Sequence, residues 1–143
     1  MYVVSDILED KGHEVLQIEA DASVFEAVKR MVDANVGSLL VSDAGRHIGI
    51  VTERDYLRRI ALERRDDETI AVRDVMSSPL VVVTPDTSID ECMAVMTDRR
   101  IRHLPVVDEG IVVGIVSIGD VVKFTSRQQS FELKFLTDFI SGH

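Results

Sequence analysis

The sequence contains an internal duplication with a period of 65 residues. Residues 21–58 align with residues 86–123 without a gap, and 13 of the aligned pairs are identical. Three consecutive identities fall in one short segment, Gly49-Ile50-Val51 in the first copy and Gly114-Ile115-Val116 in the second. Internal similarity at a fixed period is the signature of a repeated structural unit. We therefore expect two copies of one small motif.

Each copy predicts the element order β-α-β-β-α. A serine followed three residues later by glutamate starts the first helix, as in a capping box. A tight turn ending in glycine joins the two strands that follow. The expected elements, first and second copy in turn, are first strands at 15–18 and 80–83, helices after Ser23 and Ser88, hairpins over 39–51 and 104–116, and second helices from near Glu53 and near Gly119.

The repeats predict three regions: residues 1–66, residues 67–127, and a C-terminal amphipathic helix over 128–143. The charged segment 64–69 is the expected linker. Apolar residues in the last region recur at helical spacing and form one face, which a symmetric homodimer would bury. They are Phe131, Phe135, Leu136, Phe139 and Ile140.

Charge and composition narrow the possible partners. The net charge is −9 and the hydrophobic fraction is 45%, so a globular chain without nucleic-acid or membrane partners is expected. The chain lacks a long apolar run and a signal-peptide pattern, and it has a single cysteine, Cys92, so we expect a cytoplasmic location. Cys92 lies on the apolar face of its helix, which favours an inert core position.

Two matched segments carry the candidate chemistry. Thr52 and Ser117 each end a predicted strand, and Asp55 and Asp120 follow three residues later. A helix start offers unpaired N–H groups and a positive dipole end, which suit a phosphate, and a carboxylate can accept hydrogen bonds from a ribose diol. The alternative is that both segments only cap their helices. Their occurrence in register in both copies favours a functional role.

Motifs of common nucleotide enzymes and metal sites do not occur. The chain has neither a P-loop nor the glycine fingerprint of a Rossmann unit. Its four histidines and Cys92 show no spacing typical of a metal site. No nucleophile–base arrangement can be argued from the sequence, so we expect no metal and no catalytic activity.

The duplication, the two Gly-Ile-Val-(Thr/Ser)-x-x-Asp segments and the Arg-His-Leu-Pro-Val-Val segment at 102–107 resemble cystathionine-β-synthase (CBS) domains, over about residues 3–125. A tandem pair is called a Bateman module. The resemblance implies an α/β (α+β) fold with pseudo-two-fold symmetry. It also implies that an adenosine-containing ligand (AMP, ADP, ATP, NAD or S-adenosylmethionine) binds in the cleft between the repeats.

The resemblance also implies which residues contact the ligand. The hydroxyls and carboxylates of Thr52, Asp55, Ser117 and Asp120 would meet phosphate and ribose. Basic residues would balance the phosphate charge, and an apolar slot would hold adenine, largely through backbone contacts. The expected basic residues are Arg54, Arg102 and His103, and those of the slot are Ile18, Glu19, Val36, Thr84 and Ile101.

These patterns predict a stand-alone regulatory sensor that passes its signal to a partner protein. Two alternatives remain: an interaction module that binds no nucleotide, and a small hydrolase. The segment Lys11-Gly12-His13 is extra in the first copy. It is expected to form a turn, with folding over a ligand as the alternative.

Overall fold

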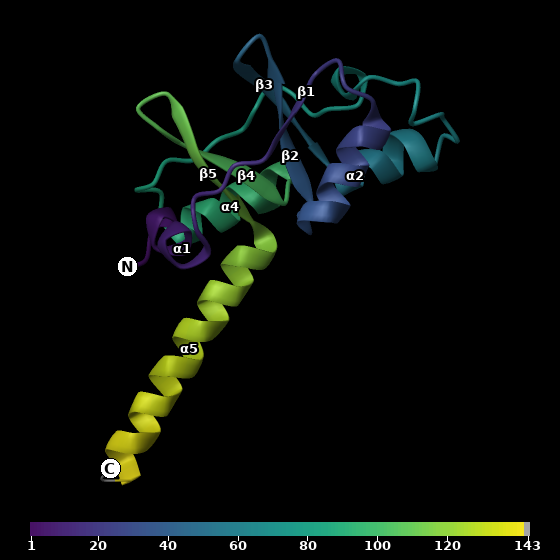
Figure 1. The fold of residues 1–143 in the computed structure, drawn as a ribbon. Helices are drawn as coiled ribbons and strands as arrows, with labels where there is room; N and C mark the ends of the chain where they lie inside the picture. The colour runs from purple at the N-terminus through teal and green to yellow at the C-terminus, as the bar shows by residue number, and fades with distance from the viewer. Residues whose placement is uncertain (142–143) are drawn as a thin grey trace. The chain divides into compact units, whose positions relative to one another are not determined.

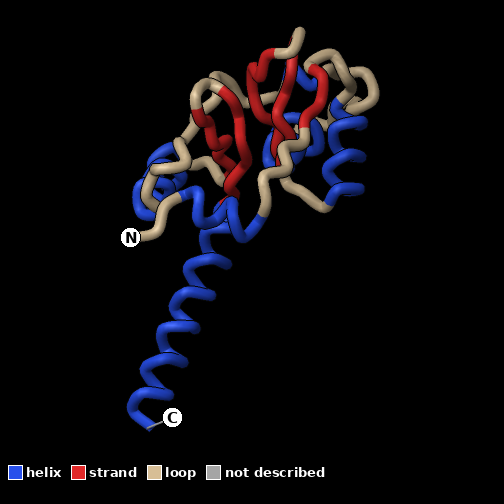
Figure 2. The backbone as a smooth tube through the Cα atoms, turned by 60° about the vertical axis from the view of Figure 1, so that its left-hand side comes forward, coloured by secondary structure: helices blue, strands red, loops and turns tan. Residues whose placement is uncertain are grey.

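The computed structural model describes residues Met1–Ser141, without the side chains of residues 135 and 137–141. The chain forms two compact units. One is the continuous segment Val15–Val81, and the other combines Met1–Glu14 with the chain from Val82 onward. Figure 2 shows the strands as two separate sets, one in each unit.

The unit Val15–Val81 holds a three-stranded sheet in the order β1-β2-β3. β1 is parallel to β2, and β2 and β3 form the predicted antiparallel hairpin. The elements are β1 (Gln17–Glu19), α2 (Val24–Ala34), β2 (Ser38–Asp43), β3 (Arg46–Thr52), α3 (Glu53–Tyr56), a π-helical turn (Leu57–Ala61) and a 3-10 turn (Val72–Asp74).

The other unit repeats this arrangement with a smaller sheet. β4 and β5 form its antiparallel hairpin; α4 precedes this hairpin as α2 precedes that of the first copy, and α5 follows it as α3 does. The elements are α1 (Val4–Lys11), α4 (Ile89–Arg99), β4 (His103–Asp108), β5 (Ile111–Ser117) and α5 (Ile118–Ser141).

The predicted helix starts are confirmed. The Ser23 hydroxyl accepts a hydrogen bond from the backbone N–H of Glu26 at 3.1 Å, and Ser88 accepts one from Glu91 at the same distance. A serine at this position satisfies an N–H group that has no partner within the helix. The Ser-x-x-Glu pattern therefore located both helices correctly.

The predicted hairpin turns are also confirmed. Ala44 and Gly45 have φ values of 51° and 80°, and the matching Glu109 and Gly110 have 50° and 79°. Positive φ at both central residues belongs to the type I′ turn, whose twist matches that of the flanking strands. Glycine takes this conformation without strain, which explains the repeated glycine.

The predicted strand at 80–83 is wrong. Only an isolated bridge between Val83 and Val106 remains, whereas β1 in the first copy pairs over three residues. In the first copy the N–H groups of Leu40 and Ala20 donate to Leu16 and Ser42. The residues that match these two donors 65 positions on are Pro105 and Pro85, which have no N–H, so the second copy loses both bonds.

Each unit completes its core with the first segment of the other repeat. Val4, Ile7 and Leu8 of α1 are 0%, 2% and 1% exposed and belong to the unit of the second repeat. Val72 and Val75 are fully buried in the core of the first repeat. The sequence repeats 1–66 and 67–127 therefore differ in content from the compact units.

The repeated Gly-Ile-Val glycine makes this packing possible. A Cβ atom at Gly114 would lie 2.7 Å from a Leu8 methyl carbon, and one at Gly49 would lie 2.9 Å from the carbonyl oxygen of Ser77. A side chain at Gly49 would collide with backbone, and one at Gly114 would force the buried Leu8 side chain to move. Both glycines therefore allow another segment to pack directly on the strand.

The expected C-terminal helix is present, but it does not start as a separate element. α5 runs without interruption from Ile118 to Ser141, because no proline or glycine follows Gly119 within it (Figure 1). Phe131 and Leu136 of the predicted apolar face are 73% and 53% exposed. The other three side chains of that face (Phe135, Phe139 and Ile140) lie outside the described residues. In the described part of the chain, no helix combines the length and apolar character required to cross a membrane.

Candidate functional site

The two matched segments form similar strand-to-helix corners, which we call the Thr52 corner (Thr52–Asp55) and the Ser117 corner (Ser117–Asp120). In each, the aspartate N–H donates to the hydroxyl oxygen, at 3.2 Å and 3.1 Å respectively. The backbone N–H of Thr52 or Ser117 donates in return to the aspartate Oδ2, at 3.0 Å and 2.8 Å. The capping role considered from the sequence is therefore present at both corners.

The carboxylate of the Thr52 corner is engaged on both oxygens. Oδ2 of Asp55 also accepts the Thr52 hydroxyl at 3.2 Å, and Oδ1 accepts the hydroxyl of Ser77 at 3.0 Å. Asp55 is only 8% exposed. Its hydrogen-bonding capacity is thus largely used within its own unit.

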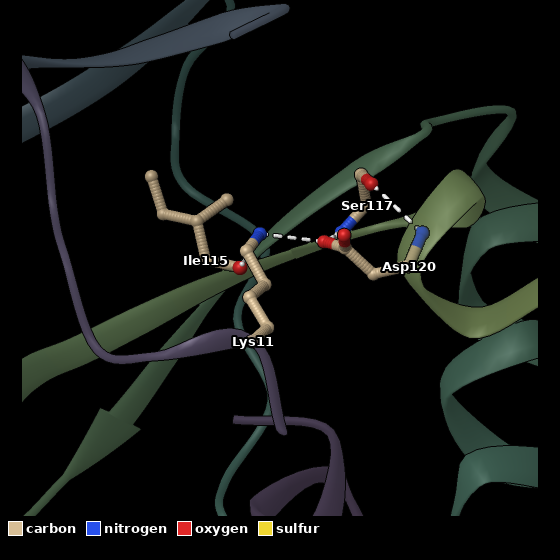
Figure 3. A network of polar contacts seen from close by, with 4 residues as sticks. All are labelled: Lys11, Ile115, Ser117 and Asp120. Carbon is tan, nitrogen blue, oxygen red and sulfur yellow. Dashed lines mark hydrogen bonds and ion pairs between the residues drawn. The ribbon is translucent and has the colours of Figure 1, made fainter. Parts of the chain in front are cut away.

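The carboxylate of the Ser117 corner is more open and carries a cation. Lys11 Nζ donates to Oδ2 of Asp120 at 2.5 Å and to the backbone oxygen of Ile115 at 2.6 Å (Figure 3). The side chains of Lys11 and Asp120 are 35% and 24% exposed. The hydrogen bonds from Lys11 Nζ and from the backbone N–H of Ser117 both reach Oδ2, and the carboxylate remains partly exposed.

The surroundings keep Asp120 ionised. Burial acts to raise the pKa of its carboxyl group, but the hydrogen bond from Lys11, the backbone N–H of Ser117 and the charge of Lys11 outweigh burial and lower the pKa. The carboxylate is therefore negatively charged at neutral pH. A charged carboxylate accepts hydrogen bonds more strongly than a neutral acid does.

The predicted basic residues lie at both corners. Arg102 is exposed and directly precedes β4, and its carbonyl accepts the N–H of Ile118 at 2.8 Å. His103 pairs with Ser117 across the hairpin. The structure thus brings Arg102 and His103 to the Ser117 corner. Arg54 is exposed in α3, within the Thr52 corner.

The residues predicted to contact adenine are divided between the units. Ile18 is 2% exposed in the core, so its side chain is not available to a ligand, and Glu19 beside it is exposed. Val36 lines a groove of about 420 Å³ along α2 and α3. Thr84 is exposed and Ile101 half-buried in the other unit. The adenine slot stays a prediction.

The sequence did not identify Lys11 as a site residue. Lys11 ends α1, and Gly12 after it has a φ of 104°. The ring of His13 then lies 3.1 Å from the carbonyl oxygen of Val113. The expected turn over Lys11–His13 is not present, because Lys11 still belongs to α1 and Gly12 and His13 form no turn; the side chains of Lys11 and His13 instead follow the edge of β5. No local pattern predicts this, because Lys11 and Asp120 are 109 residues apart.

Comparison with known proteins identifies the family. The family model of the CBS domain matches residues 4–62 and 72–127. The chain is 40% identical to the mitochondrial CBS domain-containing protein CBSX3 of Arabidopsis thaliana, over 97% of this chain and 72% of the relative. Because that relative is mitochondrial, the cytoplasmic location stays a prediction.

Solved structures agree with the family model. A signal-transduction protein with CBS domains from Burkholderia ambifaria superposes with a TM-score of 0.83 at 41% identity, over 87% of this chain and 93% of that one. The CBS domain pair of protein MJ0100, in complex with 5-methylthioadenosine and S-adenosyl-L-methionine, gives a TM-score of 0.77 at 25% identity. The match covers 90% of this chain and 98% of that one. With both repeats matched by the family model, the chain belongs to the CBS domain family as a tandem pair.

Proposed function

We propose that this protein is a regulatory module that binds an adenosine-containing ligand and that the Ser117 corner holds the sugar-phosphate part. The observation that carries the proposal is the carboxylate of Asp120, which is ionised and partly exposed. A vicinal ribose diol offers two hydroxyl donors to such an acceptor. The prediction that the ligand lies between the repeats stays a prediction.

The ligand class is supported by chemistry and by one relative. α5 begins directly after Ser117, and the positive end of a helix dipole favours a phosphate. Protein MJ0100 binds two adenosine derivatives. We therefore propose AMP, ADP or ATP as the first candidates, with NAD and S-adenosylmethionine as further ones.

The output of binding is proposed to be regulatory and not catalytic. The relatives are named as CBS domain-containing proteins and carry no enzymatic name. A ligand can change a partner only through different affinities for two states of the module. The second candidate is a module for protein interaction that binds no nucleotide, and the extensive hydrogen bonding within the Thr52 corner favours it for that half of the chain.

Thermal unfolding in the presence of AMP, ADP, ATP, NAD or S-adenosylmethionine tests the proposal. A ligand at 100 times its Kd stabilises a one-site protein by about 2.7 kcal/mol, which raises the Tm by several degrees. Inosine and guanosine nucleotides at equal concentration serve as controls for the base. An unchanged Tm with every adenosine compound, supported by calorimetry without heat of binding, would favour the interaction module.

We also propose that two chains associate through the apolar face of α5. Phe131 is 73% exposed, and large exposed apolar side chains at helical spacing are typical of an interface. We expect light scattering to give the mass of two chains for the full protein and of one chain for Phe131→Glu. Ser130→Glu adds the same charge at the neighbouring exposed position and should remain dimeric. A full-length protein with the mass of one chain would contradict the proposal.

A further inference from the structure

We propose that Lys11 is a phosphate-binding residue of the Ser117 corner and that it makes this corner prefer charged adenosine ligands to neutral ones. The inference rests on the proposed function and specifies it. Its basis is a comparison of the two units: a neutral residue fills one structural role in the first unit, and a cation fills the same role in the second.

Ser77 performs this role in the first unit. Its backbone N–H donates to the carbonyl oxygen of Ile50 at 2.8 Å, and its hydroxyl donates to Asp55 at 3.0 Å. Ile50 and Asp55 match Ile115 and Asp120 of the second copy. A neutral donor thus connects the strand edge to the carboxylate.

Lys11 performs the same role in the second unit with a single ammonium group. Its Nζ donates to the carbonyl oxygen of Ile115 at 2.6 Å and to Asp120 at 2.5 Å (Figure 3). The two units therefore share one hydrogen-bonding scheme around the corner. They differ by one positive charge.

That charge matters for a phosphate. A phosphate bound at the N-terminus of α5 comes close to the ionised Asp120, and the two negative charges repel. Lys11 neutralises Asp120 and is itself 35% exposed. An ammonium group has three N–H donors, of which the carbonyl oxygen and the carboxylate take two, so the third can reach a phosphate oxygen. The Thr52 corner lacks this compensation, because Ser77 is neutral.

The experiment compares AMP with adenosine, since they differ only in the phosphate. We expect the wild-type protein to bind AMP more tightly than adenosine by calorimetry. In Lys11→Met the Kd for AMP should rise about tenfold, as for loss of one charge-assisted hydrogen bond, while that for adenosine stays within about twofold. Lys11→Arg should retain most of the preference for AMP.

Arg127→Gln is the matched control. Arg127 forms another ion pair between α1 and α5, with Asp10 at 2.7 Å, but it lies away from the corner. Loss of the Arg127–Asp10 ion pair should leave the affinities for AMP and for adenosine unchanged. If Lys11→Met unfolds, Lys11→Gln and the salt dependence of the wild-type preference provide the same comparison.

Two results would overturn the role of Lys11: an unchanged ratio of the AMP and adenosine affinities in the uncharged variants Lys11→Met and Lys11→Gln, or equal wild-type affinities for both compounds. Both results leave the proposed function intact, because adenosine binding persists. Wild-type protein that binds neither compound, nor any other adenosine ligand, instead contradicts the proposed function itself and the role of Lys11 with it.

Discussion

Replacing Leu8 with alanine is expected to lower the free energy of unfolding by about 2–5 kcal/mol, the range for a buried leucine. Leu8 is 1% exposed in α1, which belongs to the first repeat in sequence. Its methyl groups nevertheless pack on the backbone of Gly114 in the second repeat. Urea unfolding measures the loss, and Leu62→Ala, at a leucine that is 79% exposed, should change stability by less than about 0.5 kcal/mol.

The strands that Leu8→Ala destabilises show whether α1 stabilises the unit of the second repeat. Hydrogen exchange of Leu8→Ala should show greater loss of protection in β4 and β5 than in β2 and β3, because α1 belongs to the unit of the second repeat. Greater loss in β2 and β3 would show that α1 stabilises the first repeat, to which it belongs in sequence, contrary to the structure.

Asp120→Asn is expected to have the largest effect on ligand affinity. The substitution keeps the size of the side chain but removes the charge that accepts the ribose hydroxyls. Hydrogen bonds to charged groups contribute about 1.5–3 kcal/mol, so the Kd for AMP should rise about 10- to 100-fold. The capping of α5 also weakens, and this should cost roughly 1 kcal/mol of stability.

The duplication supplies the matched variant, Asp55→Asn. Asp55 caps α3 as Asp120 caps α5, but the residue is only 8% exposed and its carboxylate accepts the Ser77 hydroxyl on its second oxygen. We therefore expect a comparable or larger loss of stability and an AMP affinity within about twofold of wild type. Comparison of Asp120→Asn with Asp55→Asn therefore separates the structural role of the aspartate from its role in ligand binding.

Much of the fold could be predicted because its determinants are local and repeated. The serine caps, the glycine turns and the alternating apolar strands each specify their element within a few residues of sequence. The strand at 80–83 was predicted wrongly because its pairing needs backbone N–H donors at position 105 in β4 and at position 85 after the strand. Both positions hold proline, which has no N–H group.

The site could be predicted only in part, for a related reason. The hydroxyl and carboxylate of each corner are three residues apart and were found from the sequence. Lys11 and Ser77 approach these corners through contacts between distant segments, 109 and 22 residues away from the carboxylates. The sequence therefore predicted two similar corners, whereas the structure shows one occupied by a neutral donor and one by a cation.

Calorimetric titration of AMP into wild type, Asp120→Asn and Asp55→Asn, each shown to be folded at the working temperature, tests the central claim most directly. The account predicts that only Asp120→Asn loses most of the affinity. Equal affinities in all three proteins, or a loss confined to Asp55→Asn, would contradict a sugar-phosphate site at the Ser117 corner.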